Sequence, residues 1–217
     1  MTKENNKFEL YDFKNIGILL KQFTEEELKP LKLEIEKIRS NFSEGIVYNK
    51  SLAGNLEKEY QLIESKNYLN KLIQPYLSEH TNYFQYLDDC AYLNEDKYLI
   101  LDSVWVNFQK KYEFNPPHKH SGIYSFVIWL EIPYKIEDEM NMPSSVNSRT
   151  NTPGNFNFLY NNSLGGISVY SIPADKKYEN VICIFPSSMF HFVNPFYTSD
   201  NYRITVSGNF SFNVKKD

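Results

Sequence analysis

Residues 98–132 read YLILDSVWVNFQKKYEFNPPHKHSGIYSFVIWLEI, and two runs within them alternate apolar with polar side chains. Both runs are rich in aromatic and β-branched residues, which suit the pleated surface of a half-buried sheet. Pro116 and Pro117, which are turn and breaker residues, separate the two runs. The stretch therefore predicts two strands, over residues 98–109 and 121–132.

Four more runs of this kind follow, so the C-terminal half of the chain is written mostly as short strands. They are NFNFLY (155–160), GISVYSI (166–172), NVICIF (180–185) and YRITVSGNFSFNV (202–214). Asn161–Asn162 and Gly165–Gly166 supply a turn between the first two of them. Many short strands in succession predict a mainly β fold, either a sandwich or a jelly-roll barrel.

The N-terminal part of the chain predicts helices instead. Thr24 and Glu27 have the spacing of a capping box, and leucine and isoleucine then recur at helical spacing until Asn41. A second apolar stripe predicts a helix over residues 65–89, where Pro75 makes a break or kink possible. We expect these helices to buttress one sheet of the β structure.

The length of 217 residues is enough for one domain with a sizeable core. Within it, we expect residues 1–97 to form the helical buttress and residues 98–217 the β core. The polar segment 135–154, rich in Ser, Asn and Pro, is too long for an ordinary hairpin turn. Loops of that length are commonly functional lids or disordered segments, so a lid-like loop is one of two expectations here.

Composition narrows the function classes. A formal net charge of −4, without basic patches, argues against general affinity for nucleic acid. The N-terminus lacks the pattern of a signal peptide, and no apolar run reaches the roughly 18 to 20 residues of a membrane span. Cys90 and Cys183 have neither the number nor the spacing of a disulfide framework or zinc site, so we expect buried thiols and a reducing cytoplasm. We expect a soluble monomer or weak homodimer.

Three of the four histidines fall in the strand-rich half of the chain, and they are the candidate metal ligands: His118, His120 and His191. Residues two apart in a strand point to the same face, so His118 and His120 can meet one ion, and His191 would close the set from a distant strand. Imidazole suits iron, copper, nickel and zinc alike. The alternative is that these histidines are ordinary surface or core residues, as we expect for His80.

Arg203 lies twelve residues after His191, at the start of a predicted strand. Thr205, Ser207 and Asn209 follow at alternate positions and share its face. A buried guanidinium would be costly without an anion, and a carboxylate is the partner that its planar fork fits best. The histidines and Arg203 together therefore indicate one site that binds a metal ion and a carboxylate. The alternative is that Arg203 is a surface cation on an edge strand.

The order of these residues resembles a known family. His-x-(acid or His), a distal His and then Arg-x-(Ser or Thr) is similar to the 2-oxoglutarate and Fe(II)-dependent oxygenases, whose core is a double-stranded β-helix of the jelly-roll or cupin-like kind. More narrowly, WVNFQKKYEFNPPHKHSGIYSFVIWLEIP, FPSSMFHFVNPF and RITVSGNF resemble an oxygenase family of bacteria and marine bacteriophages. The resemblance covers about residues 98–212, and SLAGNLEKEYQL at 51–62 also resembles the family. It implies the cytoplasm of a bacterium, including a phage-infected one.

The resemblance also implies roles for single residues. His118 would be the first iron ligand and His191 the distal one, while Arg203 would bind the C5 carboxylate of 2-oxoglutarate with help from the Thr205 hydroxyl. Asn107 and Asn209 are further candidates for polar contacts in the pocket, and each could equally be a satisfied core amide.

His120 departs from the family pattern, which usually places Asp or Glu two residues after the first His. Three ligand sets are open: three histidines, two histidines completed by water, or an acid supplied from elsewhere, such as Glu137–Glu139 in the lid-like loop. We favour three histidines.

The implied reaction uses dioxygen, oxidatively decarboxylates 2-oxoglutarate to succinate and CO₂, and hydroxylates a protein side chain or a small metabolite. A first alternative is a three-His, cupin-like dioxygenase that works without 2-oxoglutarate, which Arg203 would discriminate. A second is a non-catalytic jelly-roll module for binding or structure, in which the histidines merely pack.

Overall fold

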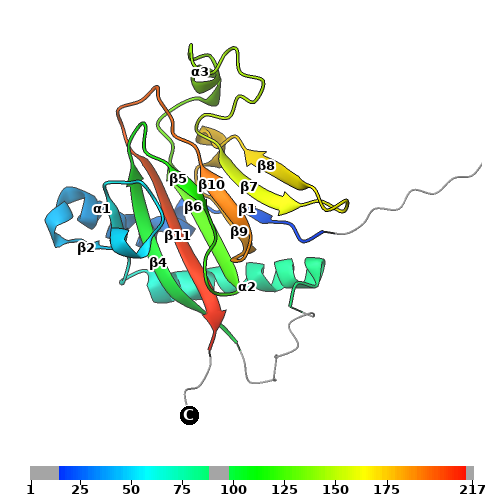
Figure 1. The fold of residues 1–217 in the computed structure, drawn as a ribbon. Coiled ribbons are helices and arrows are strands. Elements are labelled where there is room, and N and C mark those ends of the chain that lie inside the picture. Colours follow the sequence, from blue (N-terminus) through cyan, green and yellow to red (C-terminus); the bar gives the residue numbers. More distant parts are fainter. Residues whose placement is uncertain (1–14, 88–97, 214–217) are drawn as a thin grey trace, which may run out of the picture.

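The computed structural model describes residues 15–87 and 98–213, and two antiparallel sheets dominate them (Figure 1). The larger sheet has the strand order β1-β9-β6-β11-β4-β3-β2 and the smaller one the order β5-β10-β7-β8. In the larger sheet the strands are β1 (Leu19–Gln22), β2 (Ile46–Val47), β3 (Glu59–Gln61), β4 (Leu99–Gln109), β6 (Tyr124–Glu131), β9 (Val181–Pro186) and β11 (Arg203–Phe212). In the smaller sheet they are β5 (Asn115–His118), β7 (Phe156–Asn161), β8 (Ile167–Ile172) and β10 (Phe190–Val193). The predicted mainly β fold with N-terminal helices is confirmed.

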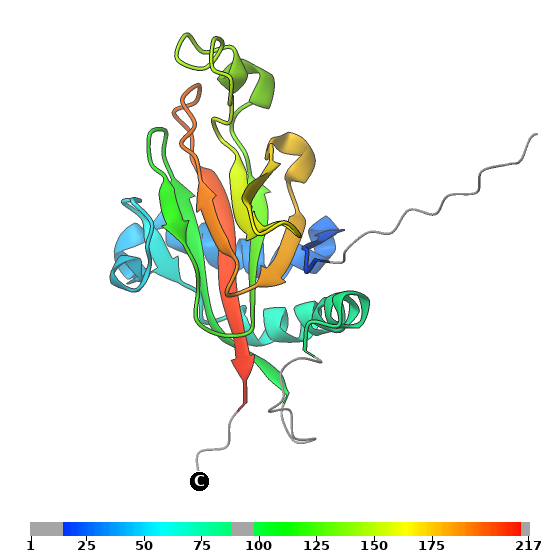
Figure 2. The ribbon, with the colours of Figure 1, turned by 45° about the vertical axis from the view of Figure 1, so that its right-hand side comes forward.

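Two long helices, α1 (Glu25–Ser40) and α2 (Lys66–Phe84), lie on the same side of the larger sheet (Figures 1 and 2). The predicted capping box is present, because the Glu27 N–H donates to Thr24 Oγ1 and the Thr24 N–H donates to Glu27 Oε2. Pro75 does not end α2, which stops at Phe84 because Gln85 adopts a left-handed conformation (φ 55°). The predicted end at residue 89 is therefore wrong. None of the helices in the described ranges has both the length and the apolarity to cross a membrane.

Alternation along the strands divides the interior into two cores. On β4, Val104, Val106 and Phe108 face the helices and join a cluster with leucines and isoleucines of α1 and α2. The opposite face of the larger sheet meets the smaller sheet in a second cluster, to which β6 contributes Val127 and Trp129. β6 is buried on both faces for this reason. Residues 105, 107 and 109 of β4 and residues 203, 205 and 207 of β11 point toward the space between the sheets.

The N-terminal half is not purely helical, because β1, β2 and β3 come from it and lie at the two edges of the larger sheet. These strands have two to four residues, too few for a period-2 pattern to stand out in the sequence. Single-turn 3₁₀ helices are also present, at Phe42–Glu44, Asn49–Ser51 and Lys176–Tyr178.

The segment 135–154 contains a short helix, α3 (Ile136–Met140), and a series of turns. Glu139 is fully buried and accepts hydrogen bonds from the N–H groups of Tyr197 and Thr198, at 2.8 Å each. The far end of the segment is held by the Gly154 N–H, which donates to Pro195 O at 2.8 Å. Both ends of this segment are thus tied to the loop before β11. Cys183 is a buried free thiol as predicted, and Cys90 lies outside the described residues.

Candidate metal centre and the pocket beside it

Two neighbouring strands of the smaller sheet bring two of the histidines together. His118 is the last residue of β5, and its Cα pairs directly with that of His191 on β10. β5 tolerates Pro116 and Pro117 because it is the edge strand of its sheet. His120 lies two residues beyond β5, so the prediction that both histidines of His-x-His lie in one strand is wrong. The His120 N–H donates to Ser187 O at 2.9 Å, and this contact holds the turn that carries it.

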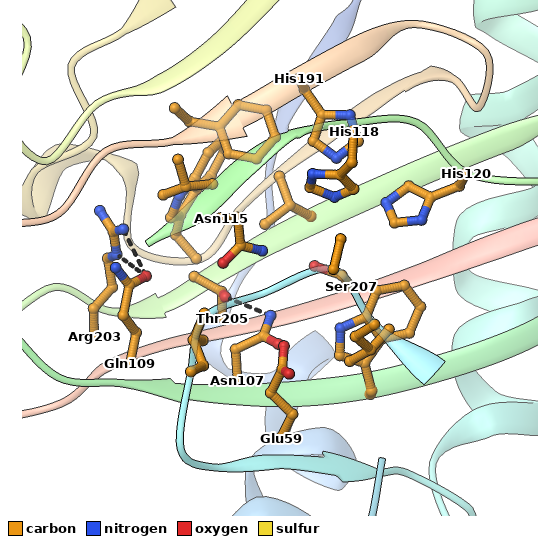
Figure 3. A pocket seen from close by; sticks show the side chains of 18 residues that line it. Glu59, Asn107, Gln109, Asn115, His118, His120, His191, Arg203, Thr205 and Ser207 are labelled. Carbon is orange, nitrogen blue, oxygen red and sulfur yellow. Dashed lines mark hydrogen bonds between the residues drawn. The ribbon is translucent and has the colours of Figure 1, made fainter. Parts of the chain in front are cut away.

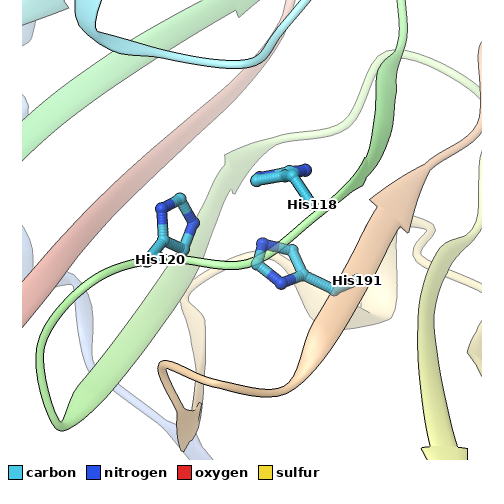
Figure 4. A group of neighbouring side chains, drawn as sticks. All are labelled: His118, His120 and His191. Carbon is cyan, nitrogen blue, oxygen red and sulfur yellow. The ribbon is translucent and has the colours of Figure 1, made fainter.

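The three imidazoles nevertheless converge (Figure 4). One ring nitrogen of each lies within 4.8 Å of the others, and the ring centroids are 4.3 to 5.0 Å apart. His118 Nδ1 lies 2.7 Å from Pro116 O, and His191 Nδ1 lies 3.1 Å from Met189 O. A carbonyl can only accept, so each Nδ1 carries the proton and leaves Nε2 with its lone pair for a ligand.

Burial keeps these rings neutral, which is the form that binds a metal. Desolvation lowers the pKa of His118 below its ordinary 6.5, and it lowers the pKa of His120 to about 4, with a smaller contribution from His118. The pKa of His191 falls well below 6.5 for the same reason, assisted by both neighbouring rings. Three neutral imidazoles aimed at one point fit a divalent transition-metal ion, because no proton has to leave before it binds.

Arg203, the first residue of β11, lines the same pocket (Figure 3) and is only 1% exposed. Its Nε and Nη2 donate to Gln109 Oε1 at 3.1 and 2.6 Å, and its Nη1 donates to Tyr134 Oη and Gly154 O at 2.6 and 2.7 Å. Nη2 also reaches Asn194 O at 3.3 Å. These five hydrogen bonds go to four acceptor atoms, all of them neutral, and within the described residues no carboxylate forms an ion pair with this guanidinium. It is a buried, rigidly held cation that fits a carboxylate ligand.

The polar face of β11 continues from Arg203 toward the histidines. Thr205 and Ser207 line the pocket, and Thr205 Oγ1 accepts a hydrogen bond from Asn107 Nδ2 on β4 at 3.1 Å. Asn209 shares the strand face but lies beyond the pocket lining, where it accepts from Ser125 Oγ at 2.7 Å and donates to Ser103 Oγ at 3.2 Å. Of the predicted polar residues, Arg203, Thr205 and Asn107 are brought together, whereas the Asn209 amide is used elsewhere.

The carboxylates at 137–139 do not join the histidine cluster. Glu137 and Asp138 are exposed, and Glu139 is held by the backbone of the 197–198 loop. Among the residues that the structure describes, the histidines alone form a group of three or more potential metal ligands.

Sequence reasoning missed four residues of this region. Gln109 and Tyr134 hold the guanidinium of Arg203, while Glu59 and Asn115 line the pocket on other sides. Gln109 could have been found, since it lies two residues after Asn107 on the same strand face. Glu59 lies on the three-residue strand β3, and no local pattern marks it as buried.

The sequence of residues 103–209 matches a family model described as "Putative 2OG-Fe(II) oxygenase". No curated protein matches the chain. All the residues of the histidine cluster and the anchor lie within the matched segment.

Solved structures with a similar fold include a prolyl-4-hydroxylase of Pseudomonas putida, with a TM-score of 0.53 and 12% identity, over 90% of this chain and 92% of that one. The protein EvdMO1 gives a TM-score of 0.51 at 14% identity, over 90% of this chain and 47% of that one. A prolyl hydroxylase of Trichoplax adhaerens, solved with a peptide fragment of hypoxia inducible factor, gives 0.49 at 12% identity, over 91% and 83%. At such identities the first two likenesses bear on the fold alone.

Proposed function

Through residues 103–209 this chain belongs to the 2OG-Fe(II) oxygenase family, and on that premise we propose that His118, His120 and His191 hold the iron and that Arg203 binds 2-oxoglutarate. The protein is therefore an oxygenase that uses Fe(II) and 2-oxoglutarate. Its two facing antiparallel sheets are those of the double-stranded β-helix, as predicted.

The observation that carries the residue roles is the buried Arg203, which has only neutral partners and lies in one pocket with three neutral imidazoles. An anion stabilises a guanidinium whose partners are all neutral, and the distal carboxylate of 2-oxoglutarate would share its N–H groups with the acceptors already present. The three imidazoles supply nitrogen ligands of the kind that Fe(II) takes. The residues present therefore fit both the metal and the co-substrate, whereas a three-His dioxygenase without 2-oxoglutarate leaves Arg203 unexplained.

When bound, Fe(II) would supply the chemistry by which dioxygen oxidises 2-oxoglutarate to succinate and CO₂ and hydroxylates a C–H bond, one oxygen atom going to succinate and one to the hydroxyl group. The side chains of the pocket orient 2-oxoglutarate and exclude water from it. Gln109, Tyr134 and Gly154 hold the Arg203 guanidinium in one orientation, so one end of 2-oxoglutarate is fixed relative to the histidines. Thr205 adds a hydroxyl beside that anchor, and the side chains of Val127, Trp129 and Phe156 line the pocket and exclude water.

We propose as substrate a protein side chain or a small metabolite with an accessible C–H bond. The similar structure from Pseudomonas putida is a prolyl-4-hydroxylase by its title, and a prolyl or other peptide substrate is accordingly one form of this proposal. No nucleic acid is part of it, because the net charge of −4 gives no general attraction for phosphates.

The test is an anaerobic titration of the Fe(II)-loaded protein with 2-oxoglutarate, followed by the weak visible metal-to-ligand charge-transfer band. We expect the band in the wild-type protein, no band in His118→Ala, and affinity for 2-oxoglutarate reduced by about a hundredfold or more in Arg203→Ala. Asn209→Ala is the matched control, since it removes a polar side chain from the same strand outside the pocket. Far-UV circular dichroism of each variant shows whether it is folded. Wild-type protein that binds iron but gives no band contradicts the proposal.

We also propose a monomer or weak homodimer in the cytoplasm, where the buried thiol of Cys183 would stay reduced. Light scattering at micromolar protein and fractionation of the source cell would test these two points. A tight higher oligomer, or recovery of the protein from an oxidising compartment, contradicts them.

A further inference from the structure

The acid Glu59 has no role in the reaction as derived above. It lies on β3, it is 1% exposed, and it lines the same pocket as Arg203 and the histidines. Both of its carboxyl oxygens are buried, and neither accepts a hydrogen bond from any described residue. Burying a carboxyl group without a partner is costly, so its presence in a pocket calls for a ligand.

No basic side chain of the described residues neutralises Glu59. The neighbouring Lys58 points to the other face of the sheet, where its Nζ donates to Tyr202 Oη at 3.0 Å and lies 4.1 Å from the Phe42 ring centroid. Arg203 is held by Gln109 and Tyr134 at a different corner of the pocket (Figure 3). The charge of Glu59 is therefore not balanced from within the chain.

The atoms around Glu59 are acceptors as well. Asn107 and Asn115 each have a buried Oδ1 that accepts no hydrogen bond from the described residues, and Figure 3 shows the Asn107 side chain beside Glu59. A Cβ added at Gly54 would lie 2.9 Å from Glu59 Oε1 and 3.2 Å from Asn115 Oδ1, so these two oxygens border one small space. A group that satisfies this corner must donate several hydrogen bonds.

The electrostatics point the same way. Burial, with a smaller contribution from Glu113, raises the pKa of Glu59 to about 7, so near neutral pH the side chain is only partly ionised. A protonated nitrogen placed against it would favour the ionised form and would satisfy all three acceptor groups at once. Leu56 borders the same space, since its Cδ1 would lie 2.8 Å from a Cβ added at Gly54. Leu52 and Ala53 also line the pocket, and the three side chains offer an apolar surface to an aliphatic chain.

We propose that Glu59, with Asn107 and Asn115, recognises a cationic nitrogen of the substrate that is hydroxylated. The substrate is then an aliphatic ammonium or guanidinium compound, whose stem packs on Leu52 and Leu56 and brings a C–H bond toward the histidine cluster. This inference rests on the proposed function of the same pocket and deepens it. The carboxylate of 2-oxoglutarate goes to Arg203, and the cation of the substrate goes to Glu59.

The test compares pairs of amino-acid amides in which one member carries a cationic nitrogen that the other lacks, with Fe(II) and 2-oxoglutarate present and oxygen excluded. The pairs are N-acetyl-L-arginine amide with N-acetyl-L-citrulline amide, N-acetyl-L-lysine amide with N-acetyl-L-norleucine amide, and L-norleucine amide with N-acetyl-L-norleucine amide. Binding is measured by calorimetry. In the wild-type protein we expect the cationic member of at least one pair to bind about tenfold more tightly or better than its neutral partner.

Glu59→Gln keeps the shape of the side chain and removes its charge. We expect the preference for the cation to fall to about twofold or less in this variant. The preferred cationic amino acid is also tested as residue X of a capped Gly-Gly-X-Gly-Gly peptide. Tighter binding of the peptide identifies a protein substrate, and tighter binding of the single amino acid identifies a free metabolite.

Two results overturn the inference: no pair that shows a preference for the cation in the wild-type protein, or a preference that Glu59→Gln leaves intact. Both readouts are independent of the charge-transfer band of the wild-type protein with 2-oxoglutarate. A normal band without cation preference refutes the role of Glu59 alone, whereas an absent band refutes the proposed function.

Discussion

The pocket holds two buried ionisable side chains, Arg203 and Glu59, that differ in how well their hydrogen-bonding groups are satisfied. Arg203 and Glu59 are each 1% exposed. Arg203 donates five hydrogen bonds to neutral acceptors, so its position is fixed before any ligand arrives. Glu59 accepts none from the described residues and is surrounded by further acceptors. The cation is an anchor that is already positioned, whereas the acid lacks the partner that would stabilise its charge.

The largest effect on ligand binding is expected from a substitution that places a carboxylate of the protein itself against Arg203, where we propose that 2-oxoglutarate binds. Gln109 Oε1 already accepts from Nε and Nη2 of Arg203, so Gln109→Glu would place a carboxylate against the same fork. We expect affinity for 2-oxoglutarate to fall by about a hundredfold in the anaerobic titration, because the guanidinium is then neutralised from within. Unchanged affinity would show that the carboxylate of 2-oxoglutarate binds elsewhere.

The next effect is the contribution of Glu59 to the pH dependence of the unfolding free energy. The pKa of Glu59 is about 7 in the folded protein and ordinarily 4.5, so folding favours its protonated form. The stabilisation is full below pH 4.5 and is lost as the pH rises through 7. Relative to Glu59→Gln, the wild-type protein should lose roughly 2 to 3 kcal/mol of unfolding free energy between pH 5 and 8. Urea denaturation of both proteins across this range measures it, and parallel profiles would mean that Glu59 is paired.

A smaller effect, on the affinity for 2-oxoglutarate, is expected at Thr205, which lines the pocket together with Arg203 and Glu59. Thr205→Val keeps the shape of the side chain but leaves Asn107 Nδ2 without its acceptor at 3.1 Å. We expect roughly tenfold weaker binding of 2-oxoglutarate, from the loss of about 1 to 2 kcal/mol. Asn209→Ala, on the same strand face but outside the pocket, should leave the affinity unchanged. Equal losses in both variants would mean that strand integrity, and not the pocket, sets the affinity.

The smallest effect tests how firmly the anchor is held. Tyr134→Phe removes one acceptor of Arg203 Nη1 and leaves the other, Gly154 O, in place. Calorimetric titration with 2-oxoglutarate should show a change of only a few fold, and the unfolding free energy should fall by about 1 kcal/mol. A loss as large as that of Gln109→Glu would show that Tyr134 itself contacts the ligand.

The cation and the acid also differ in how well the sequence predicts them. Arg203 follows its histidine at a recognisable spacing and begins a long strand with clear alternation, so its place could be predicted. Glu59 is buried because β3 pairs with β4, in a register that sets Glu59 opposite Asn107, which in turn is opposite Thr205 on β11. That row across three strands is a tertiary fact, and a three-residue strand leaves no periodic signal for it.

The histidine cluster was partly predictable from the sequence, less so than Arg203 and more so than Glu59. Its three residues could be picked out from the sequence, but the elements that carry them could not. Pro116 and Pro117 indicate a turn, and only their place on an edge strand lets β5 form and pair His118 with His191. His120 then reaches the cluster from the turn after β5, and its contact with Ser187 O fixes this position.

The most direct test of the whole arrangement is a crystal structure of the protein grown without oxygen in the presence of Mn(II) and 2-oxoglutarate. We predict the metal on His118, His120 and His191, the distal carboxylate of 2-oxoglutarate on Arg203, and no part of the co-substrate against Glu59. A metal held without these histidines, or a 2-oxoglutarate carboxylate that does not contact Arg203, would contradict the account.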